Sequence, residues 1–202
     1  MYWRSLNLKQ LGQWARRPRG LENEGEAPSP SINMIIEKLK PFEDLIAEAC
    51  DAQNTDIQMV MAIIWQESRG DSFAMRFEPH LKPEFTNMPK TWALKHAISM
   101  DTEINAQHVS YGLMQILGVT AREIGFDDKW PKLFIPKTNL FWGCKFLNKL
   151  QQRFNTSDDI IAAYNAGTPK KIDGKYTNQR YVDAVNTHIK MIEYEKQKSG
   201  KS

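Results

Sequence analysis

Residues 62–70 read AIIWQESRG, and this stretch decides how the chain folds. An apolar run leads into a single carboxylate, Glu67, and a glycine follows three residues later. The apolar residues recur at helical spacing, and Asp56 upstream is a residue type that caps helix N-termini. We therefore predict a largely buried helix that begins after Asp56 and ends near Gly70, with Glu67 in its last turn.

A carboxylate in the last turn of a buried helix has an unusual environment. Loss of hydration disfavours the charged form of a carboxyl and so raises its pKa. The helix dipole acts in the same direction, because a helix C-terminus disfavours negative charge. A carboxyl that stays protonated near neutral pH can act as a general acid. Taken alone, Glu67 is better explained as an exposed glutamate that begins a loop, so other segments must decide.

Two further segments carry side chains suited to sugar binding. YGLMQ combines a glycine-permitted turn with Met114 and the amide of Gln115, and AYNAG places Tyr164 and Asn165 before a helix-ending glycine. Amide and phenol groups hydrogen-bond sugar hydroxyl and acetamido groups, and aromatic faces pack on pyranose rings. Each segment alone is equally consistent with ordinary core packing, so only the combination of segments supports a sugar-binding site.

The remaining pattern is mostly helical, with few strand signals. We predict a mainly α, or α+β, fold: a single compact helical domain with at most a small β element near YGLMQ. The domain would span residues 31–197, with a proline-containing insertion at about 71–108 and a polar loop at 168–179. Residues 1–30 are expected to be a basic tail or linker, and residues 198–202 a C-terminal tail. The expected helices lie at about 31–39, 41–50, 56–68, 92–98, 120–125, 138–150, 158–166 and 181–194.

In this order, ES, GLMQ and AYNAG resemble the motifs of the lytic transglycosylases of the soluble-lytic-transglycosylase type, which have a goose-lysozyme-like fold. The segment IPKTNLFWGCKFLNKLQQRFN is similar to the family's proline, asparagine and glycine helix. TAREIG resembles its short preceding helix, and QRYV its closing tyrosine-valine element. The resemblance covers about residues 41–195 and implies a lysozyme-like domain.

The resemblance implies a role for each matching residue. Glu67 would be the single acid/base, and Tyr181 would hydrogen-bond it. Gln115 would line the glycan site, and Met114 would pack against a sugar. Tyr164 and Asn165 would hold Glu67 and the sugar beside the scissile bond.

The chain departs from the family pattern before GLMQ. A serine that the family often carries near the substrate acetamido group aligns with Ala106 here, and Ser110 is our candidate to replace it. The insertion contains RFEPH, which resembles segments of phage and bacterial muramidases. We expect this segment either to wall the cleft or to be a surface insertion.

The resemblance also implies the reaction, which is cleavage of the MurNAc-β-1,4-GlcNAc bond of peptidoglycan to give 1,6-anhydro-MurNAc ends. One carboxylate suffices if the sugar supplies the nucleophile, whereas hydrolytic glycosidases usually pair two. Two alternatives stay open. The chain could be a lysozyme that hydrolyses the same bond with a water held by Asp71 or another acid. It could also be a non-catalytic glycan-binding or structural module.

Composition and residue spacing argue against nucleic-acid binding, metal binding and a membrane span. The chain has 202 residues and a formal net charge of +3, which is too little to indicate a nucleic-acid-binding protein. Cys50 and Cys144 are expected to be buried free thiols, and the spacing of His80, His96 and His108 matches no metal motif. No apolar stretch is long enough for a membrane span. We predict no metal, cofactor or nucleic-acid partner.

The N-terminal segment suggests where the chain acts. It lacks the continuous apolar region of a signal peptide, although peptidoglycan lies outside the cytoplasm. Its basic, tryptophan-containing residues 1–30 would suit docking onto a larger assembly. We therefore expect an enzyme of a phage virion, attached through residues 1–30 to the tail or another part of the particle, that acts on the host periplasm and cell wall.

Overall fold

The structure, a computed structural model, describes residues 32–78 and 86–199; the predicted tail at 1–30 lies outside them. Its helices are α1 (Ile32–Leu39), η2 (Lys40–Phe42), α2 (Glu43–Gln53), α3 (Ile57–Ser68), α4 (Pro89–His96), α5 (Met100–Gln107), α6 (Gly118–Glu123), η4 (Trp130–Phe134), α7 (Pro136–Gln151), α8 (Ser157–Ala166) and α9 (Gln179–Ser199). Its strands are β1 (Met75–Phe77), β2 (Val109–Tyr111), β3 (Ile116–Leu117), β4 (Lys171–Ile172) and β5 (Lys175–Tyr176). The predicted mainly α fold is confirmed.

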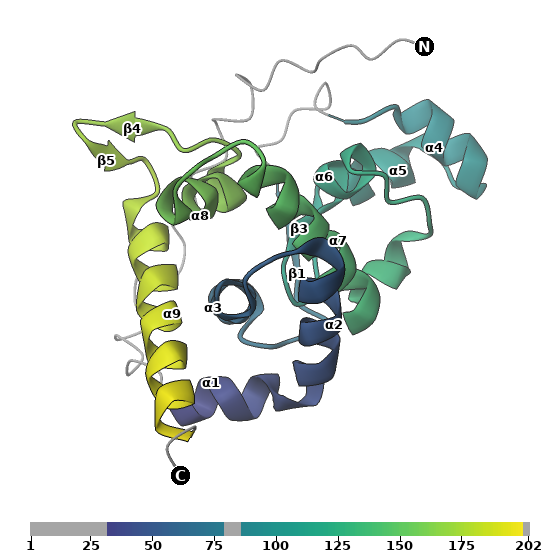
Figure 1. Cartoon of the computed structure of the whole chain (residues 1–202). Coiled ribbons are helices and arrows are strands. Elements are labelled where there is room, and N and C mark those ends of the chain that lie inside the picture. The colour runs from purple at the N-terminus through teal and green to yellow at the C-terminus, as the bar shows by residue number, and fades with distance from the viewer. Residues whose placement is uncertain (1–31, 79–85, 200–202) are drawn as a thin grey trace, which may run out of the picture.

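Helix α3 forms the centre of the larger hydrophobic core. Figure 1 shows it end-on, surrounded by α1, α2, α8 and α9. Its residues from Ala62 to Trp65 are all buried, and the Asp56 side chain caps it by accepting a 2.7 Å hydrogen bond from Met59 N. Both the helix and its cap were predicted from sequence. The last turn of α3, which carries Glu67, is therefore held in a fixed position by the surrounding helices.

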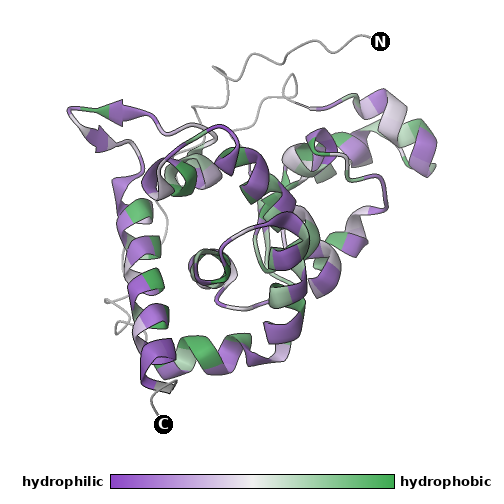
Figure 2. Ribbon diagram, in the orientation of Figure 1, coloured by the Kyte–Doolittle hydropathy of each residue, from purple (hydrophilic) through white to green (hydrophobic). Residues whose placement is uncertain are grey.

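The helices around α3 each bury apolar residues in the same hydrophobic core. Figure 2 shows hydrophobic and hydrophilic residues alternating along α9, as expected of a helix with one buried side. Cys50 of α2 and Cys144 of α7 are buried free thiols, as predicted. None of the helices within residues 32–78 and 86–199 is both long and apolar enough to cross a membrane.

A three-stranded antiparallel sheet, in the order β1-β2-β3, lies beside this core. Arg76 pairs with Ser110, and Ser110 pairs with Leu117. The turn between β2 and β3 contains the YGLMQ segment, where the sequence predicted a small β element. Tyr111 stacks on Trp130 in a second hydrophobic cluster, so the sheet joins the two clusters.

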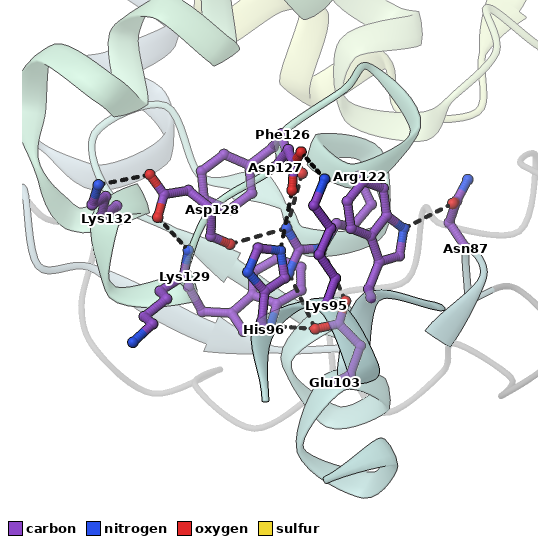
Figure 3. A network of polar contacts seen from close by, with 12 residues as sticks. Asn87, Lys95, His96, Glu103, Arg122, Phe126, Asp127, Asp128, Lys129 and Lys132 are labelled. Carbon is purple, nitrogen blue, oxygen red and sulfur yellow. Dashed lines mark hydrogen bonds and ion pairs between the residues drawn. The ribbon is translucent and has the colours of Figure 1, made fainter. Parts of the chain in front are cut away.

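A buried ion pair stabilises the second cluster. Glu103 and Arg122 are fully buried, and Arg122 Nε donates to Glu103 Oε1 at 2.9 Å. Trp130 Nε1 donates to Glu103 Oε2 at 2.8 Å, and the Arg122 guanidinium lies 4.0 Å from the Trp130 ring centroid. Figure 3 shows this network with Lys95 and His96 of α4 beside it. Helices α4, α5 and α6 are thereby joined.

Two parts of the chain differ from the sequence prediction. Residues 71–109 were read as irregular except for a helix at 92–98, yet they also contain β1 and α5. Helix α5 lacks a helical apolar pattern because its two buried residues are Glu103 and Gln107. Residues 168–179 were read as a loop and instead contain the β4–β5 hairpin, which the dipeptide Asp173-Gly174 could have revealed.

Candidate active site

The C-terminal end of α3 is tied to the turn between β2 and β3. Ser68 Oγ lies 2.7 Å from Leu113 O, to which it donates, and 3.2 Å from Ile64 O. Arg69 then ends the helix in the left-handed conformation, at φ 56°. Ser68 therefore supports the helix end, and it places its neighbour Glu67 beside the turn.

Glu67 is half-buried and accepts a hydrogen bond from α9. Tyr181 Oη donates to Glu67 Oε1 at 2.7 Å, and the Tyr181 side chain is 7% exposed. Tyr181 lies in the first turn of α9, which packs along α3. The hydrogen bond expected between these residues is present, and it orients the carboxyl group.

The turn from Gly112 to Gln115 is fixed by the fully buried amide of Asn139. Asn139 Oδ1 accepts from Met114 N, and its Nδ2 donates to Tyr111 O and Leu133 O, each at 2.8 Å. Gly112 has φ 68°, and a Cβ there would lie 2.5 Å from Asn139 Nδ2. Only glycine therefore fits this position without displacing the amide.

Tyr164 holds the other side of the same turn. Its phenol donates to Met114 O at 2.8 Å, so the backbone N–H and C=O of Met114 are both occupied. Burial, and after it the negative charge of Glu67, raises the pKa of Tyr164 well above its usual value. Tyr164 is therefore a neutral hydrogen-bond donor to the turn.

The side chain of Met114 does not lie where a sugar could contact it. It is fully buried, and a Cβ added to Gly143 of α7 would lie 2.3 Å from its sulfur. The sugar contact expected from the sequence is therefore replaced by packing against the glycine of α7. The small residue at 143 allows the turn to approach that helix closely.

Gln115 takes the left-handed conformation, at φ 45°, and its side chain folds back onto the backbone. Its Nε2 donates to Ala74 O at 2.8 Å and to Gly112 O at 3.0 Å. The amide thus joins the start of β1 to the turn that faces the end of α3.

The SLT-domain family model, described as Transglycosylase SLT domain, matches residues 44–185, which contain all of the contacts described above. The chain belongs to this family. It is also 30% identical, over 140 residues, to the Membrane-bound lytic murein transglycosylase F of Desulfosudis oleivorans (strain DSM 6200 / JCM 39069 / Hxd3). That alignment covers 66% of this chain and 23% of the relative, so the chain spans less than a quarter of the relative's length. No solved structure matches the chain.

Two predicted residues of this SLT domain lie at the edge of the group. Ser110 is 4% exposed, and its hydroxyl donates to Glu78 Oε1 at 3.3 Å, where Arg76 Nε also donates at 2.6 Å. Asn165 Oδ1 accepts from Asn178 Nδ2 at 3.0 Å. Tyr181 and Tyr164 thus contact Glu67 and the turn directly. Ser110 and Asn165 instead bond to Glu78 and Asn178.

Sequence reasoning did not single out several residues that shape the SLT site. Asn139 and Gly143 lie in the helix that was matched to the family, but the sequence did not predict which residues they contact. Glu78, from RFEPH, is a second carboxylate on the sheet, held by Ser110. Asp71, the candidate for a hydrolytic acid, is exposed and accepts from Phe73 N at 2.8 Å. In the described part of the chain, no three His, Cys, Asp or Glu side chains are grouped to hold a metal ion.

Proposed function

We propose that the chain is a peptidoglycan lytic transglycosylase that cleaves the MurNAc-β-1,4-GlcNAc bond and leaves 1,6-anhydro-MurNAc ends. The observation that carries this proposal is the 2.7 Å hydrogen bond from Tyr181 to Glu67, inside a domain of the SLT family. A buried phenol that orients one carboxyl beside a glycine turn suits a reaction with a single acid/base group.

In this mechanism Glu67 acts twice. As an acid it protonates the oxygen between the two sugars, and the 2-acetamido group stabilises the oxocarbenium-like centre. As a base it then takes the proton of the muramyl C6 hydroxyl, which closes the anhydro ring. Water is not consumed, so no second carboxylate is required to activate it. The exposed position of Asp71, engaged with its own loop, supports this reaction over hydrolysis at that residue.

The remaining residues support Glu67 and the substrate. Tyr164 and Asn139 fix the turn at Met114, and we assign Met114 a positioning role in place of a sugar contact. Gln115 lines the glycan site while its amide nitrogen holds the turn. Asn165 and Ser110 remain candidate substrate-binding residues at its edges.

Mass spectrometry of the products tests the reaction directly. Purified sacculi are digested with the wild-type chain, with Glu67→Gln, and with Glu37→Gln as a control at an exposed glutamate of α1. We expect anhydro-muropeptides from the wild type and the control, and none from Glu67→Gln. Reducing ends in place of anhydro ends would mean hydrolysis, and equal digestion by Glu67→Gln would mean that Glu67 is not the acid.

We also propose that the enzyme is carried by a phage particle and acts on the host cell wall. The support is compositional: residues 1–30 contain five cationic side chains before the first acidic one, together with two tryptophans. The test is mass spectrometry of particles purified from a host that encodes the chain. Its presence at a fixed copy number per particle is expected, and its absence from intact particles would overturn this setting.

A further inference from the structure

A short hairpin stands between two segments of the site. Strands β4 and β5 follow Tyr164 and Asn165 of α8 and precede Tyr181 of α9, and Figure 1 shows the hairpin projecting beyond both helices. Asp173 and Gly174 form its two-residue turn, with φ 51° and 77°. Two successive positive φ values are typical of the type I′ turn, which matches the twist of a hairpin. The projection therefore has a defined backbone.

One face of the hairpin is anchored to α8. Lys171 and Tyr176 are cross-strand partners and so share this face. Tyr176 is buried, and its phenol donates to Asp159 Oδ1 at 2.6 Å. Lys171 Nζ lies 3.5 Å from the same carboxylate oxygen and 4.4 Å from the Tyr176 ring centroid. Lys171 is therefore committed to holding the hairpin in place.

The opposite face carries positive charge and apolar surface. Ile172 and Lys175 are the other cross-strand pair; both are exposed, and the Ile172 side chain is 56% exposed. Lys170 precedes β4, and its carbonyl accepts from Thr177 N at 2.9 Å, which continues the antiparallel pairing. By alternation it is on the same side as Ile172, and it is also exposed. Within residues 32–78 and 86–199, neither Lys170 nor Lys175 has an ion-pair partner. Two uncompensated cations thus flank one exposed alkyl side chain.

The base of the hairpin is connected to the site by hydrogen bonds. Asn178, which follows β5, donates from Nδ2 to Asn165 Oδ1 and to Ala162 O, each at 3.0 Å. The next turn of chain carries Tyr181, the partner of Glu67. A strand rises about 3.3 Å per residue, so the outward face lies on the order of 10 Å from this base. A substituent of a bound glycan strand can reach that far.

Charge is concentrated in this segment. Residues 168–180 contain four cationic side chains and one carboxylate, a formal charge of +3, which equals that of the entire chain. The rest of the protein is therefore neutral on balance. A cationic face of this kind attracts the anionic groups of a substrate. It has no comparable attraction for sugar rings, which are uncharged.

We propose that the outward face of the β4–β5 hairpin, formed by Lys170, Ile172 and Lys175, binds the peptides attached to the muramyl residues of the glycan strand. The inference rests on the proposed function, because it takes peptidoglycan as the substrate. The two ammonium groups pair with peptide carboxylates, and Ile172 packs against aliphatic peptide side chains. The hairpin thus makes the domain favour peptide-bearing strands over bare ones.

The test uses soluble glycan strands in two forms: bearing their peptides, and after removal of the peptides by an amidase. The full chain is compared with Lys170→Gln/Lys175→Gln and with Lys190→Gln/Lys196→Gln, a charge-matched control on the later turns of α9. Exposed ion pairs contribute little individually, so the expected change is moderate. We expect KM on peptide-bearing strands to rise about three- to tenfold in the hairpin variant, with kcat unchanged.

On bare strands, the hairpin variant and the wild type should have the same KM. The difference on peptide-bearing strands should also shrink at 0.5 M salt, where charges are screened beyond a few ångströms. Equal kinetics of all three proteins on peptide-bearing strands would overturn the inference, as would an equal rise in KM on both substrates. A wild type inactive on both substrates would instead overturn the proposed function, which keeps the two failures distinct.

Discussion

Tyr181 Oη lies 2.7 Å from Glu67 Oε1, although the two residues are 114 positions apart in the chain. The contact joins the first turn of α9 to the last turn of α3, and these helices pack along one another. Glu67 is therefore held by the long helix that follows the hairpin, and not only by its own helix. The orientation of the proposed acid depends on how α9 docks.

Replacing Tyr181 with phenylalanine should reduce activity and leave the fold intact. The variant removes one hydroxyl whose partner, Glu67, is half-buried. Glu67 becomes negatively charged as it gives up its proton, and a hydrogen bond to a charged group contributes about 1.5–3 kcal/mol. Without this stabilisation kcat should fall about tenfold to a hundredfold. The release of muropeptides from sacculi measures the rate, and thermal unfolding checks the fold.

Tyr194→Phe is the matched control for this variant, because Tyr194 lies on the same helix and is 65% exposed. It should retain wild-type activity. If Tyr181→Phe turned over substrate as fast as Tyr194→Phe, the hydrogen bond to Glu67 would have no part in the reaction.

The steric fit of Gly112 in the YGLMQ turn can be tested by comparison with Gly174 in the β4–β5 turn. Gly112 and Gly174 both have positive φ, but a Cβ at Gly112 would lie 2.5 Å from Asn139 Nδ2, whereas Gly174 has open space. Gly174→Ala should cost about 1 kcal/mol from backbone strain alone. Gly112→Ala adds overpacking and should cost about 2–4 kcal/mol. Urea unfolding measures both values, and equal losses would mean that Asn139 moves aside freely.

The sequence was sufficient for the helices whose buried residues are apolar. The run from Ala62 to Trp65 and the cap at Asp56 predicted α3 within a residue or two. Helix α5 could not be found in this way, because it buries Glu103 and Gln107, whose burial is offset by hydrogen bonds from distant residues, Arg122 and Asn87. Hydrophobic periodicity contains no information about such partners.

The site was predictable to a similar extent. Family resemblance, and not periodicity, brought Tyr181 to Glu67 across the chain. The direction of the Met114 side chain could not be predicted, because it depends on the left-handed backbone of the turn and on the close approach of Gly143. A motif identifies which residues gather at a site, whereas packing decides which atoms face the substrate.

The buried pair of Glu103 and Arg122 should be more sensitive to the loss of one partner than of both. Arg122→Met leaves a fully buried carboxylate without its counter-charge and should cost about 3–5 kcal/mol. Adding Glu103→Leu removes that charge and should restore part of the stability. The recovery is partial because Trp130 Nε1 loses its acceptor and Gln107 Nε2 loses one of its two. Urea unfolding of the single and double variants tests this; a double variant less stable than Arg122→Met would contradict it.

His188 should make the domain less stable in mild acid. Burial, and after it the positive charge of Arg69, lower the pKa of His188 to about 4 from a usual 6.5. Below pH 6.5 the unfolded chain binds a proton at this histidine, whereas the folded chain stays neutral until about pH 4. The stabilising contribution is therefore present above pH 6.5 and is lost as the pH falls towards 4, by at most about 1.4 kcal/mol per pH unit.

His188→Leu removes this titration and isolates its effect, because the other ionisable groups are shared with the wild type. The free energy of unfolding is measured by urea titration of both proteins at pH 7, 6, 5 and 4.5. The stability of the wild type relative to the variant should fall steadily through this series. The ring is 6% exposed on the face of α9 that packs towards the core, so protonation would place a charge where little water can reach it. A difference that stays constant with pH would show that His188 titrates alike in both states.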